Sequence, residues 1–266
     1  MQSVPGFLDL PPRSTKPRMA GLTHVLDKGV PPFELESLVT RAGAMMDIWK
    51  LGWGTAYLDP DVPEKIALLA GHGIRACVGG TLLEVAWTQG KAESCLAWAA
   101  DVGFPCIEVS NGAVGMPVSE KRRLIAQAFG RFVVLSEVGS KDPDVPVSPA
   151  AWSEEIAGDV DAGASWVLAE GRESGTVGLY EPDGGVREDV VEAIVGTVGL
   201  PRVIFEAPRK DQQAWFISRF GPDVNLGNIA PVDLIGLEAL RLGLRADTVQ
   251  LSRPVGGAEI QTEVEG

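Results

Sequence analysis

Short apolar runs alternate with helical patterns along most of the chain. Eight of the runs are rich in Val, Ile and Leu and are bounded by Gly, Pro or polar residues, a pattern typical of short buried strands. They predict strands over Leu22–Leu26, Met46–Leu51, Ile74–Val78, Cys106–Val109, Phe132–Ser136, Trp166–Ala169, Val203–Phe205 and Val224–Leu226. Between the runs, apolar residues recur at helical spacing, most clearly at Val190, Val191, Ile194, Val195 and Val198.

The predicted helices have recognisable ends, with prolines such as Pro149 in first turns and glycines such as Gly199 after the last apolar position. Eight strand–helix units match a closed parallel barrel better than an open doubly wound sheet, which usually has five or six strands. The open sheet is the alternative. We therefore expect one α/β domain, a (β/α)8 TIM-type barrel over residues 21–250, with a loose N-terminal arm (1–20) and a mobile C-terminal tail (251–266).

Composition excludes several classes of protein. The 266 residues are 45% hydrophobic and have a formal net charge of -13, so the whole chain lacks the positive surface that nucleic acid or an anionic membrane would require. No apolar run approaches the roughly 20 residues of a membrane span, and the residues up to Arg18 do not resemble a secretory signal. Three cysteines without a Cys-x-x-Cys pair indicate a reducing compartment. We expect a cytoplasmic protein.

Charged residues gather where the predicted strands end, which in a parallel barrel is the face that holds the active site. Four successive strands end in a glutamate, namely Glu108, Glu137, Glu170 and Glu206. A single glutamate there more often anchors a loop. Four carboxylates together repel one another and call for a divalent cation, a basic partner or a raised pKa. Because basic residues lie at the same ends of the predicted strands, the set favours a functional site; these are Lys28, Lys50, Lys141 and Arg172.

Phosphate binding is suggested by the glycine-rich loops, although each is weak evidence alone. The chain has neither a Gly-x-x-x-x-Gly-Lys-Ser/Thr motif nor a dinucleotide fingerprint. The segment 227–230 follows the last predicted strand and precedes Pro231, where barrels often bind phosphate, so it is either a phosphate site or an ordinary turn. His24 and His72 are expected to be structural.

Several ordered motifs resemble the phosphosulfolactate synthase family, and the resemblance extends from Gly21 to Thr248. The motifs are Asp27-Lys28-Gly29, Lys50-Leu51-Gly52-Trp53-Gly54-Thr55, Gly79-Gly80-Thr81-Leu82-Leu83-Glu84, Ile107-Glu108-Val109-Ser110-Asn111-Gly112, Glu170-Gly171-Arg172-Glu173-Ser174-Gly175, Phe205-Glu206-Ala207-Pro208, Val224-Asn225-Leu226-Gly227-Asn228-Ile229 and 240–248.

The resemblance implies a (β/α)8 barrel that adds sulfite to phosphoenolpyruvate, with Mg²⁺ as cofactor, to give (2R)-phospho-3-sulfolactate. This is the first step of one coenzyme M pathway. On this basis Lys141 is the expected acid, and Lys28 and Lys50 are expected to hold the substrate carboxylate or sulfite. The expected magnesium ligands come from Glu108, Glu137, Glu170 and Glu206, and the expected substrate and phosphate contacts are Arg172, Ser174, Asn225, Gly227 and Asn228. A homo-oligomer is the default for such a barrel.

The chain departs from the family pattern at three positions. Ser140-Lys141 stands where two adjacent lysines are common, Asn111 where Asp is common, and Leu83 where Phe is common. Three other functions also stay open: a family member with another nucleophile or acceptor, a non-catalytic relative of the plant heat-stress-associated proteins, and an unrelated phospho-sugar aldolase that uses a Schiff-base lysine.

Overall fold

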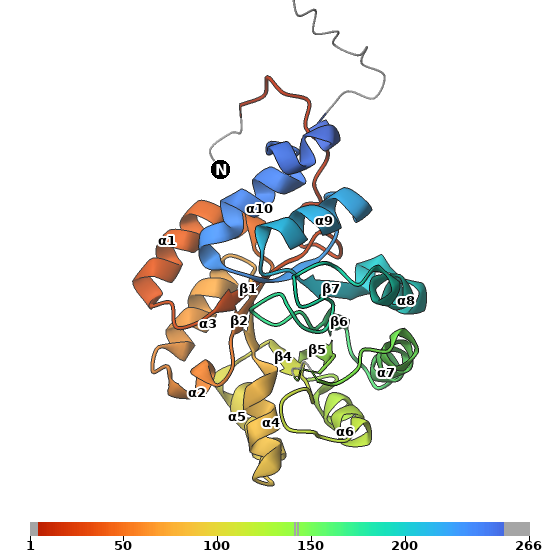
Figure 1. Ribbon diagram of the computed structural model, residues 1–266. Helices are drawn as coiled ribbons and strands as arrows, with labels where there is room; N and C mark the ends of the chain where they lie inside the picture. The colour runs from red at the N-terminus through yellow and green to blue at the C-terminus, as the bar shows by residue number, and fades with distance from the viewer. Residues whose placement is uncertain (1–4, 141, 143, 253–266) are drawn as a thin grey trace, which may run out of the picture.

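Eight parallel strands form a closed barrel in the order β1 to β8 in the computed structural model, which describes residues 5–140, 142 and 144–252 (Figure 1). The pairing of β1 with β8 closes the sheet and excludes the open alternative. The strands are β1 (Thr23–Asp27), β2 (Ile48–Leu51), β3 (Arg75–Val78), β4 (Cys106–Val109), β5 (Val133–Val138), β6 (Trp166–Ala169), β7 (Val203–Glu206) and β8 (Leu226–Ile229).

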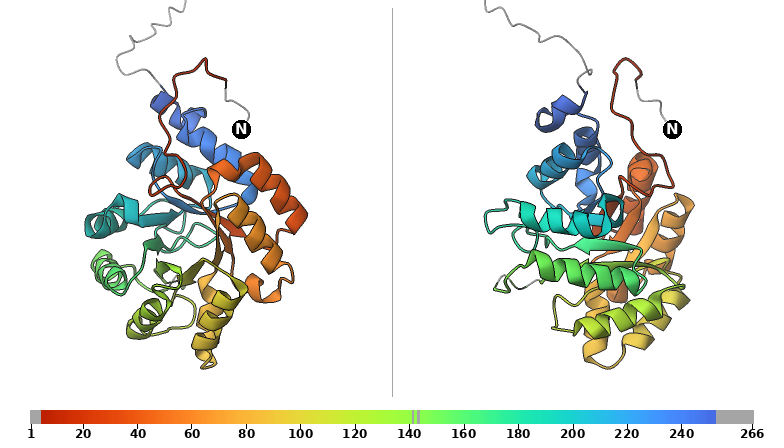
Figure 2. Two further views of the ribbon diagram at one scale, coloured as in Figure 1. Left: turned by 180° about the vertical axis from the view of Figure 1, so that it is seen from behind. Right: turned by 90° about the vertical axis from the view of Figure 1, so that its right-hand side faces the viewer.

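Helices surround the barrel on its outside in both views of Figure 2. They are α1 (Pro32–Ala42), α2 (Thr55–Leu58), α3 (Val62–Gly71), α4 (Gly80–Thr88), α5 (Ala92–Val102), α6 (Val118–Ala128), α7 (Pro149–Asp161), α8 (Glu188–Val198), α9 (Lys210–Phe220) and α10 (Leu234–Arg241). Short 3-10 turns lie at Gly43–Met45, Leu200–Arg202, Pro231–Asp233 and Ala246–Ser252. The predicted (β/α)8 barrel is therefore confirmed. Among the described residues no helix is long and apolar enough to cross a membrane.

The last strand is the one whose predicted position was wrong. The sequence predicts Val224–Leu226, whereas β8 spans Leu226–Ile229 and includes Gly227 and Asn228. Because Gly and Asn are typical of turns, the sequence pattern predicted a turn at Gly227 and Asn228 where the structure has a strand. An added Cβ on Gly227 would lie 3.2 Å from His24 Nδ1 and 3.1 Å from Ile204 Cγ2, so glycine leaves the room that these neighbours occupy.

Successive strand residues point to opposite faces, so each strand has an inner and an outer set. Outer residues such as Trp49 and Phe205 pack against the helices. The inner set begins with an apolar layer, composed of Leu22, Ile48, Cys77, Cys106, Leu135, Trp166, Leu168 and Ile204. Two residues further along the strands, the inner positions are buried and polar, at His24, Lys50, Glu108, Glu137, Glu170 and Glu206. The barrel thus has an apolar floor beneath a charged layer.

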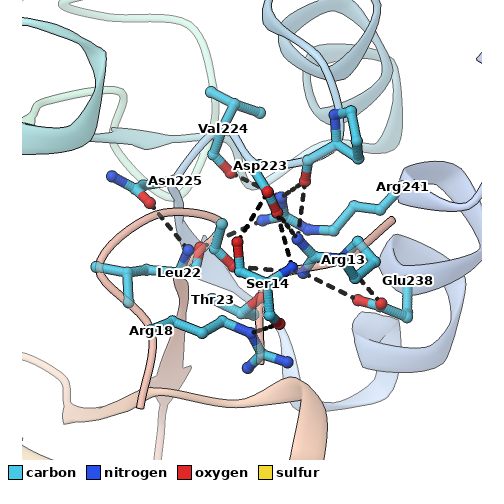
Figure 3. A network of polar contacts seen from close by, with 12 residues as sticks. Arg13, Ser14, Arg18, Leu22, Thr23, Asp223, Val224, Asn225, Glu238 and Arg241 are labelled. Atoms are coloured by element: carbon cyan, nitrogen blue, oxygen red, sulfur yellow. Dashed lines mark hydrogen bonds and ion pairs between the residues drawn. The ribbon is translucent and has the colours of Figure 1, made fainter. Parts of the chain in front are cut away.

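The N-terminal arm is held against the barrel from Arg13 onward, which corrects the expectation of a loose arm. Arg13 Nη1 lies 2.5 Å from Asp223 Oδ1, and its Nε lies 3.0 Å from Glu238 Oε1 on α10 (Figure 3). The buried Arg18 pairs with Asp47 at 3.1 Å. Because Asp47 and Asp223 precede β2 and β8, the arm crosses the amino ends of the strands. Most of the predicted C-terminal tail lies outside the described residues.

The apolar floor should contribute strongly to stability. Leu168→Ala, which removes a fully buried side chain from that layer, is expected to lower the free energy of unfolding by about 2–5 kcal/mol. Leu58→Ala is the matched control, because Leu58 on α2 is 79% exposed and its truncation should cost less than about 0.5 kcal/mol. Urea unfolding of both variants tests this, and equal midpoints would contradict it.

Candidate active site

A cavity of about 260 Å³ opens at the carboxyl ends of the strands, directly above the apolar floor. All four predicted glutamates line it, together with Lys50, Arg172 and Asn228. The remaining lining residues are Leu26, Trp53, Gly80, Thr81, Ala113 and Glu173. The structure therefore brings most of the sequence-predicted site residues to one place.

Lys50 lies at the centre of the charged layer. Its Nζ is 3.1 Å from Glu108 Oε1 and 3.4 Å from Glu206 Oε1, and the side chain is 6% exposed. Burial alone would lower the pKa of Lys50, but the surrounding carboxylates of Glu108, Glu206 and Glu137 outweigh it and raise the pKa above its ordinary value. Lys50 is therefore a fixed positive charge across the physiological pH range.

Glu108 on β4 is held through both carboxylate oxygens. Oε1 lies 3.1 Å from Lys50 Nζ and 3.1 Å from His24 Nε2, while Oε2 accepts the Gly80 N–H at 3.1 Å. Burial would raise the pKa of Glu108, but Lys50, followed by His24 and the Gly80 N–H, lowers it to about 2. Glu108 thus stays ionised although it is buried.

Two other glutamates fix the loop that follows β6. Glu206 Oε2 accepts the Gly171 N–H at 3.0 Å, and Glu170 Oε1 accepts the Arg172 N–H at 2.6 Å. Arg172 adopts a φ of 56°, which is uncommon for a residue other than glycine. The two carboxylates hold this turn in place. As a result, the guanidinium of Arg172 lines the cavity.

Buried cations on the outer helices brace the strand ends from behind. Lys65 of α3 lies 3.1 Å from Asp27 Oδ2 at the end of β1 and 2.6 Å from Asp59. Lys121 of α6 donates to the Glu137 carbonyl oxygen at 2.6 Å. Neither lysine was singled out from the sequence, because each lies in a helix whose strand partner is distant along the chain. Both lysines therefore help to fix the carboxyl ends of the strands that carry the charged layer.

Glu84 is another residue whose function sequence reasoning missed. On α4, its carboxylate accepts the Ser110 hydroxyl at 2.5 Å and the Ala113 and Val114 N–H groups at 2.8 and 3.1 Å. It therefore anchors the loop after β4, which supplies Ala113 to the cavity. The one feature of the sequence that pointed to Glu84 was its position at the end of the Gly79–Glu84 motif.

The remaining predicted residues are distributed unevenly. Lys28 lies on the rim, with Nζ 3.0 Å from Glu173 Oε2 and 5.6 Å from the Trp53 ring centroid, beside a second cavity of about 480 Å³. Ser174 is exposed and its hydroxyl contacts Thr176 at 2.8 Å. Lys141 lies outside the described residues.

Asn225 is not at the mouth. Its side chain bonds the Leu22 N–H at 2.9 Å and the Val203 carbonyl at 2.9 Å, near the amino ends of β1 and β7. The misplaced start of β8 explains this outcome, because the shift of the strand moves Asn225 to the opposite end of the barrel. Here it links neighbouring strands and has no access to substrate.

Two of the departures from the family pattern lie away from the mouth cavity. Leu83 is fully buried in the outer apolar core, and Asn111 donates to the Met116 carbonyl at 3.2 Å. Neither belongs to the described lining of the mouth cavity. Their effect on the pocket is therefore indirect.

The predicted magnesium ligands line one cavity without forming a ready-made cage. In the described part of the chain, no three His, Cys, Asp or Glu side chains are arranged to hold a metal ion. Lys50 already pairs with Glu108 and Glu206. The donor set still suits Mg²⁺, which prefers oxygen ligands and usually binds through one or two carboxylates together with water and substrate oxygens. Glu137, at the end of β5, and Glu170, directly after β6, both line the cavity and could supply carboxylate ligands in this mode.

The cysteines take no part in the site. Cys77, Cys95 and Cys106 are free and buried. Burial, and the adjacent Cys106 thiol, raise the pKa of the Cys77 thiol, and burial raises the pKa of Cys95 to about 11. Thiols with raised pKa values are poor nucleophiles.

Comparison with known proteins gives a consistent result. The family described as (2R)-phospho-3-sulfolactate synthase (ComA) matches residues 11–247. The phosphosulfolactate synthase of Methanothermobacter thermautotrophicus is 43% identical over 245 residues, covering 90% of this chain and 95% of that protein. The phosphosulfolactate synthase of Bacillus subtilis is 43% identical over 244 residues, covering 91% and 97%.

More distant matches were also found. The HEAT-STRESS-ASSOCIATED 32 protein of Arabidopsis thaliana is 23% identical over 262 residues, covering 86% of this chain and 88% of that protein. Among solved structures, 3-hexulose-6-phosphate synthase from Salmonella typhimurium superposes with a TM-score of 0.54 at 12% identity, covering 86% of this chain and 97% of that chain. At that identity the likeness concerns the barrel alone.

The lowered pKa of Glu108 predicts a specific loss of stability in acid. Because the folded pKa of about 2 lies below the ordinary value of 4.5, the unfolded chain takes up the proton first, and stability falls as the pH falls from about 4.5 to 2. About 1 kcal/mol of this loss is expected between pH 6 and pH 4. Urea unfolding at both pH values should show it in the wild type and not in Glu108→Gln.

Glu93→Gln is the control for that measurement, because the Glu93 side chain is 76% exposed. This variant should lose as much stability between pH 6 and pH 4 as the wild type does. An unchanged acid dependence in Glu108→Gln would show that the carboxylate is not held ionised by Lys50 and His24.

Proposed function

The chain belongs to the (2R)-phospho-3-sulfolactate synthase family, and we propose that its barrel mouth joins sulfite to phosphoenolpyruvate to give (2R)-phospho-3-sulfolactate. The observation that supports this most strongly is the 43% identity to phosphosulfolactate synthases over nine-tenths or more of each chain. The mouth is consistent with the reaction, since it combines the buried Lys50 and the exposed Arg172 with carboxylates in a cavity of about 260 Å³, large enough for two small anions.

The reaction makes one carbon–sulfur bond and adds one proton. The sulfur lone pair of sulfite attacks C3 of phosphoenolpyruvate, and the electron pair of the C2–C3 double bond moves toward C2 and the adjacent carboxylate. A proton then adds to C2, and the phosphate ester is retained. The barrier is lowered by groups that stabilise the negative charge that builds on the carboxylate and by an acid positioned at C2.

Lys50 is suited to the first of these tasks. Its ammonium is held in place by Glu108 and Glu206, and its raised pKa keeps it charged. A fixed charge in a buried site stabilises a developing anion without reorganisation. The same raised pKa argues against a Schiff-base role, because an amine nucleophile has to lose its proton. The aldolase alternative therefore loses its best candidate among the described lysines.

Arg172 and Lys28 are suited to hold the anionic ends of the substrates. Arg172 lines the cavity from the loop after β6, and a guanidinium can donate two parallel hydrogen bonds to a phosphate. Lys28 stands on the rim, where it can exchange Glu173 for a substrate anion. Asn228, between the two cavities, can add its side-chain amide. We assign the phosphate to Arg172 and Asn228, beside Gly227.

The charge balance of the mouth supports a role for Mg²⁺. The described lining has five carboxylates, those of Glu108, Glu137, Glu170, Glu173 and Glu206, against the cations of Lys50 and Arg172. Two anionic substrates would enter a cavity that is already negative. A divalent cation held by Glu137 and Glu170 would correct that balance and would act as a Lewis acid toward the substrate carboxylate.

The acid that protonates C2 remains a prediction. Lys141 is the candidate from the sequence, since it follows the Glu137-Val138-Gly139 end of β5. Ser140 replaces the first lysine of the pair that is common in the family, so Lys141 would have to serve alone.

A non-catalytic role like that suggested for the heat-stress-associated relatives is less well supported. The Arabidopsis protein is 23% identical to this chain, against 43% for the synthases. The buried Lys50, Glu108 and Glu206 network is also costly to maintain in a protein without chemistry, because burying ionised groups carries a desolvation penalty.

Loss of Arg172 should abolish most of the activity without unfolding the chain. Arg172→Ala removes an exposed side chain that lines the cavity, so kcat/KM for phosphoenolpyruvate is expected to fall about 100-fold or more. Phosphorus NMR of the reaction with phosphoenolpyruvate and sulfite measures it. Arg123→Ala on α6, where the side chain is 42% exposed, is the matched control and should keep full activity. If both variants stay active, the phosphate assignment is wrong.

Metal removal tests the role of Mg²⁺. Treatment with a chelator should stop the formation of the new phosphate ester, and Mg²⁺ should restore it, while far-ultraviolet circular dichroism stays unchanged because the described residues form no closed metal cage. Glu137→Gln should raise the Mg²⁺ concentration needed for half-maximal rate. Full turnover after exhaustive chelation would exclude the metal from the reaction.

A further inference from the structure

His24 is a buried polar group of the mouth that the proposed chemistry does not use. It lies on β1, fully buried in the charged layer, and its ring is enclosed by groups from two other strands. Its Nε2 lies 3.1 Å from Glu108 Oε1 on β4, across the barrel. Its Nδ1 accepts the Asn228 N–H of β8 at 3.4 Å. The imidazole therefore connects the last strand to the centre of the site.

These contacts assign the ring proton. A backbone N–H is always a donor, so the nitrogen that faces Asn228 has to accept, and the proton is on Nε2. That nitrogen faces the Glu108 carboxylate, which can only accept when ionised. In the neutral Nε2–H form Nδ1 accepts the Asn228 N–H, whereas a proton on Nδ1 would oppose it. The Nε2–H then faces Glu108 Oε1 at 3.1 Å, an approach that this structure does not align as a hydrogen bond.

The oxygen that His24 contacts is the one that holds Lys50. Glu108 Oε1 lies 3.1 Å from Lys50 Nζ as well as 3.1 Å from His24 Nε2. With Oε2 on the Gly80 N–H, the His24 contact completes the restraint of the carboxylate. Without it, Glu108 would keep one fewer donor on the oxygen that sets the position of Lys50, and the ammonium would be free to shift toward Glu206.

We propose that His24 is a positioning residue for the synthase reaction, which fixes Glu108 through a neutral Nε2–H donor and thereby places the Lys50 ammonium at the reacting carboxylate. This inference rests on the proposed function, because it concerns the role of Lys50 in that reaction. Gly227 is part of the same arrangement, since a Cβ there would come within 3.2 Å of His24 Nδ1. The turn-like Gly227 in the middle of β8 is thus explained by the ring beside it.

Two substitutions separate the donor from the rest of the side chain. His24→Gln keeps an N–H near the position of Nε2, and His24→Leu keeps similar bulk without a donor. Neither variant keeps the ring Nδ1. Gln alone carries an N–H donor that can face Glu108, and its amide oxygen can still accept the Asn228 N–H, so the comparison tests the polar contacts of His24 against its bulk. We expect His24→Leu to lower kcat about 10- to 100-fold with the KM for phosphoenolpyruvate changed less than about threefold. His24→Gln should recover most of the lost kcat.

The other histidine supplies the control. His72→Leu, at the exposed end of α3, should leave kcat unchanged. A His24→Leu variant with wild-type kcat, or an equal loss of kcat in His24→Leu and His24→Gln, overturns the proposal. A loss confined to KM overturns it as well. Absence of turnover in the wild type would instead refute the proposed function.

Nitrogen NMR tests the same contact in the unmodified protein, which matters if His24→Leu does not fold. With ¹⁵N-labelled histidine the chain gives two ring systems, His24 and His72. We expect His24 to have a protonated Nε2 with a slowly exchanging proton and an unprotonated Nδ1. A protonated Nδ1, or a rapidly exchanging Nε2 proton, contradicts the proposed geometry whatever the activity.

Discussion

The mouth of this barrel depends on the ion pairs between Lys50 and the glutamates around it. Four inner-facing glutamates in one layer of a closed barrel repel one another, and burial increases the repulsion. The Lys50 ammonium, 3.1 Å from Glu108 and 3.4 Å from Glu206, offsets that repulsion at the centre. Those carboxylates in turn accept backbone N–H groups at the start of α4 and after β6. One buried cation is thus linked, through these two carboxylates, to the loop positions around the cavity.

The same layer accounts for the match between family and site. Sulfite addition needs positive charge at the substrate carboxylate, and in the proposed reaction the layer would supply it from the inside of the barrel. Arg172 and Lys28 would supply it from the loops above. Lys65 and Lys121, although buried and charged, lie outside the barrel and serve the loops indirectly. Position in the fold, and not residue type, separates the two groups of cations.

The sequence predicted the barrel, seven of its strands to within two residues at each end, and the four glutamates at the mouth. The alternation of strands and helices is a local pattern that can be recognised in the sequence. The pairing of His24 with Glu108 cannot be recognised there, because residues on β1 and β4 come together only when the barrel closes. Asn225 was misplaced for a related reason: Gly227 and Asn228 have turn propensities, and the packing of His24 overrides them. The fixed arm was missed because Arg13 finds its partners more than 200 residues away.

The contacts of the arm lie at one end of the barrel and the cavity lies at the other, so residues at the two ends can be substituted independently. Arg13 and Arg18 cross the amino ends of the strands, and the charged layer lies at the carboxyl ends. Substitutions around Asp223 or Glu238 can therefore tune thermal endurance with little effect on turnover, whereas substitutions at the mouth can alter substrate choice without opening the barrel. A fusion partner or surface tether attached ahead of Arg13 would face away from the entrance, so the enzyme could be immobilised by its N-terminus with its substrates still able to enter.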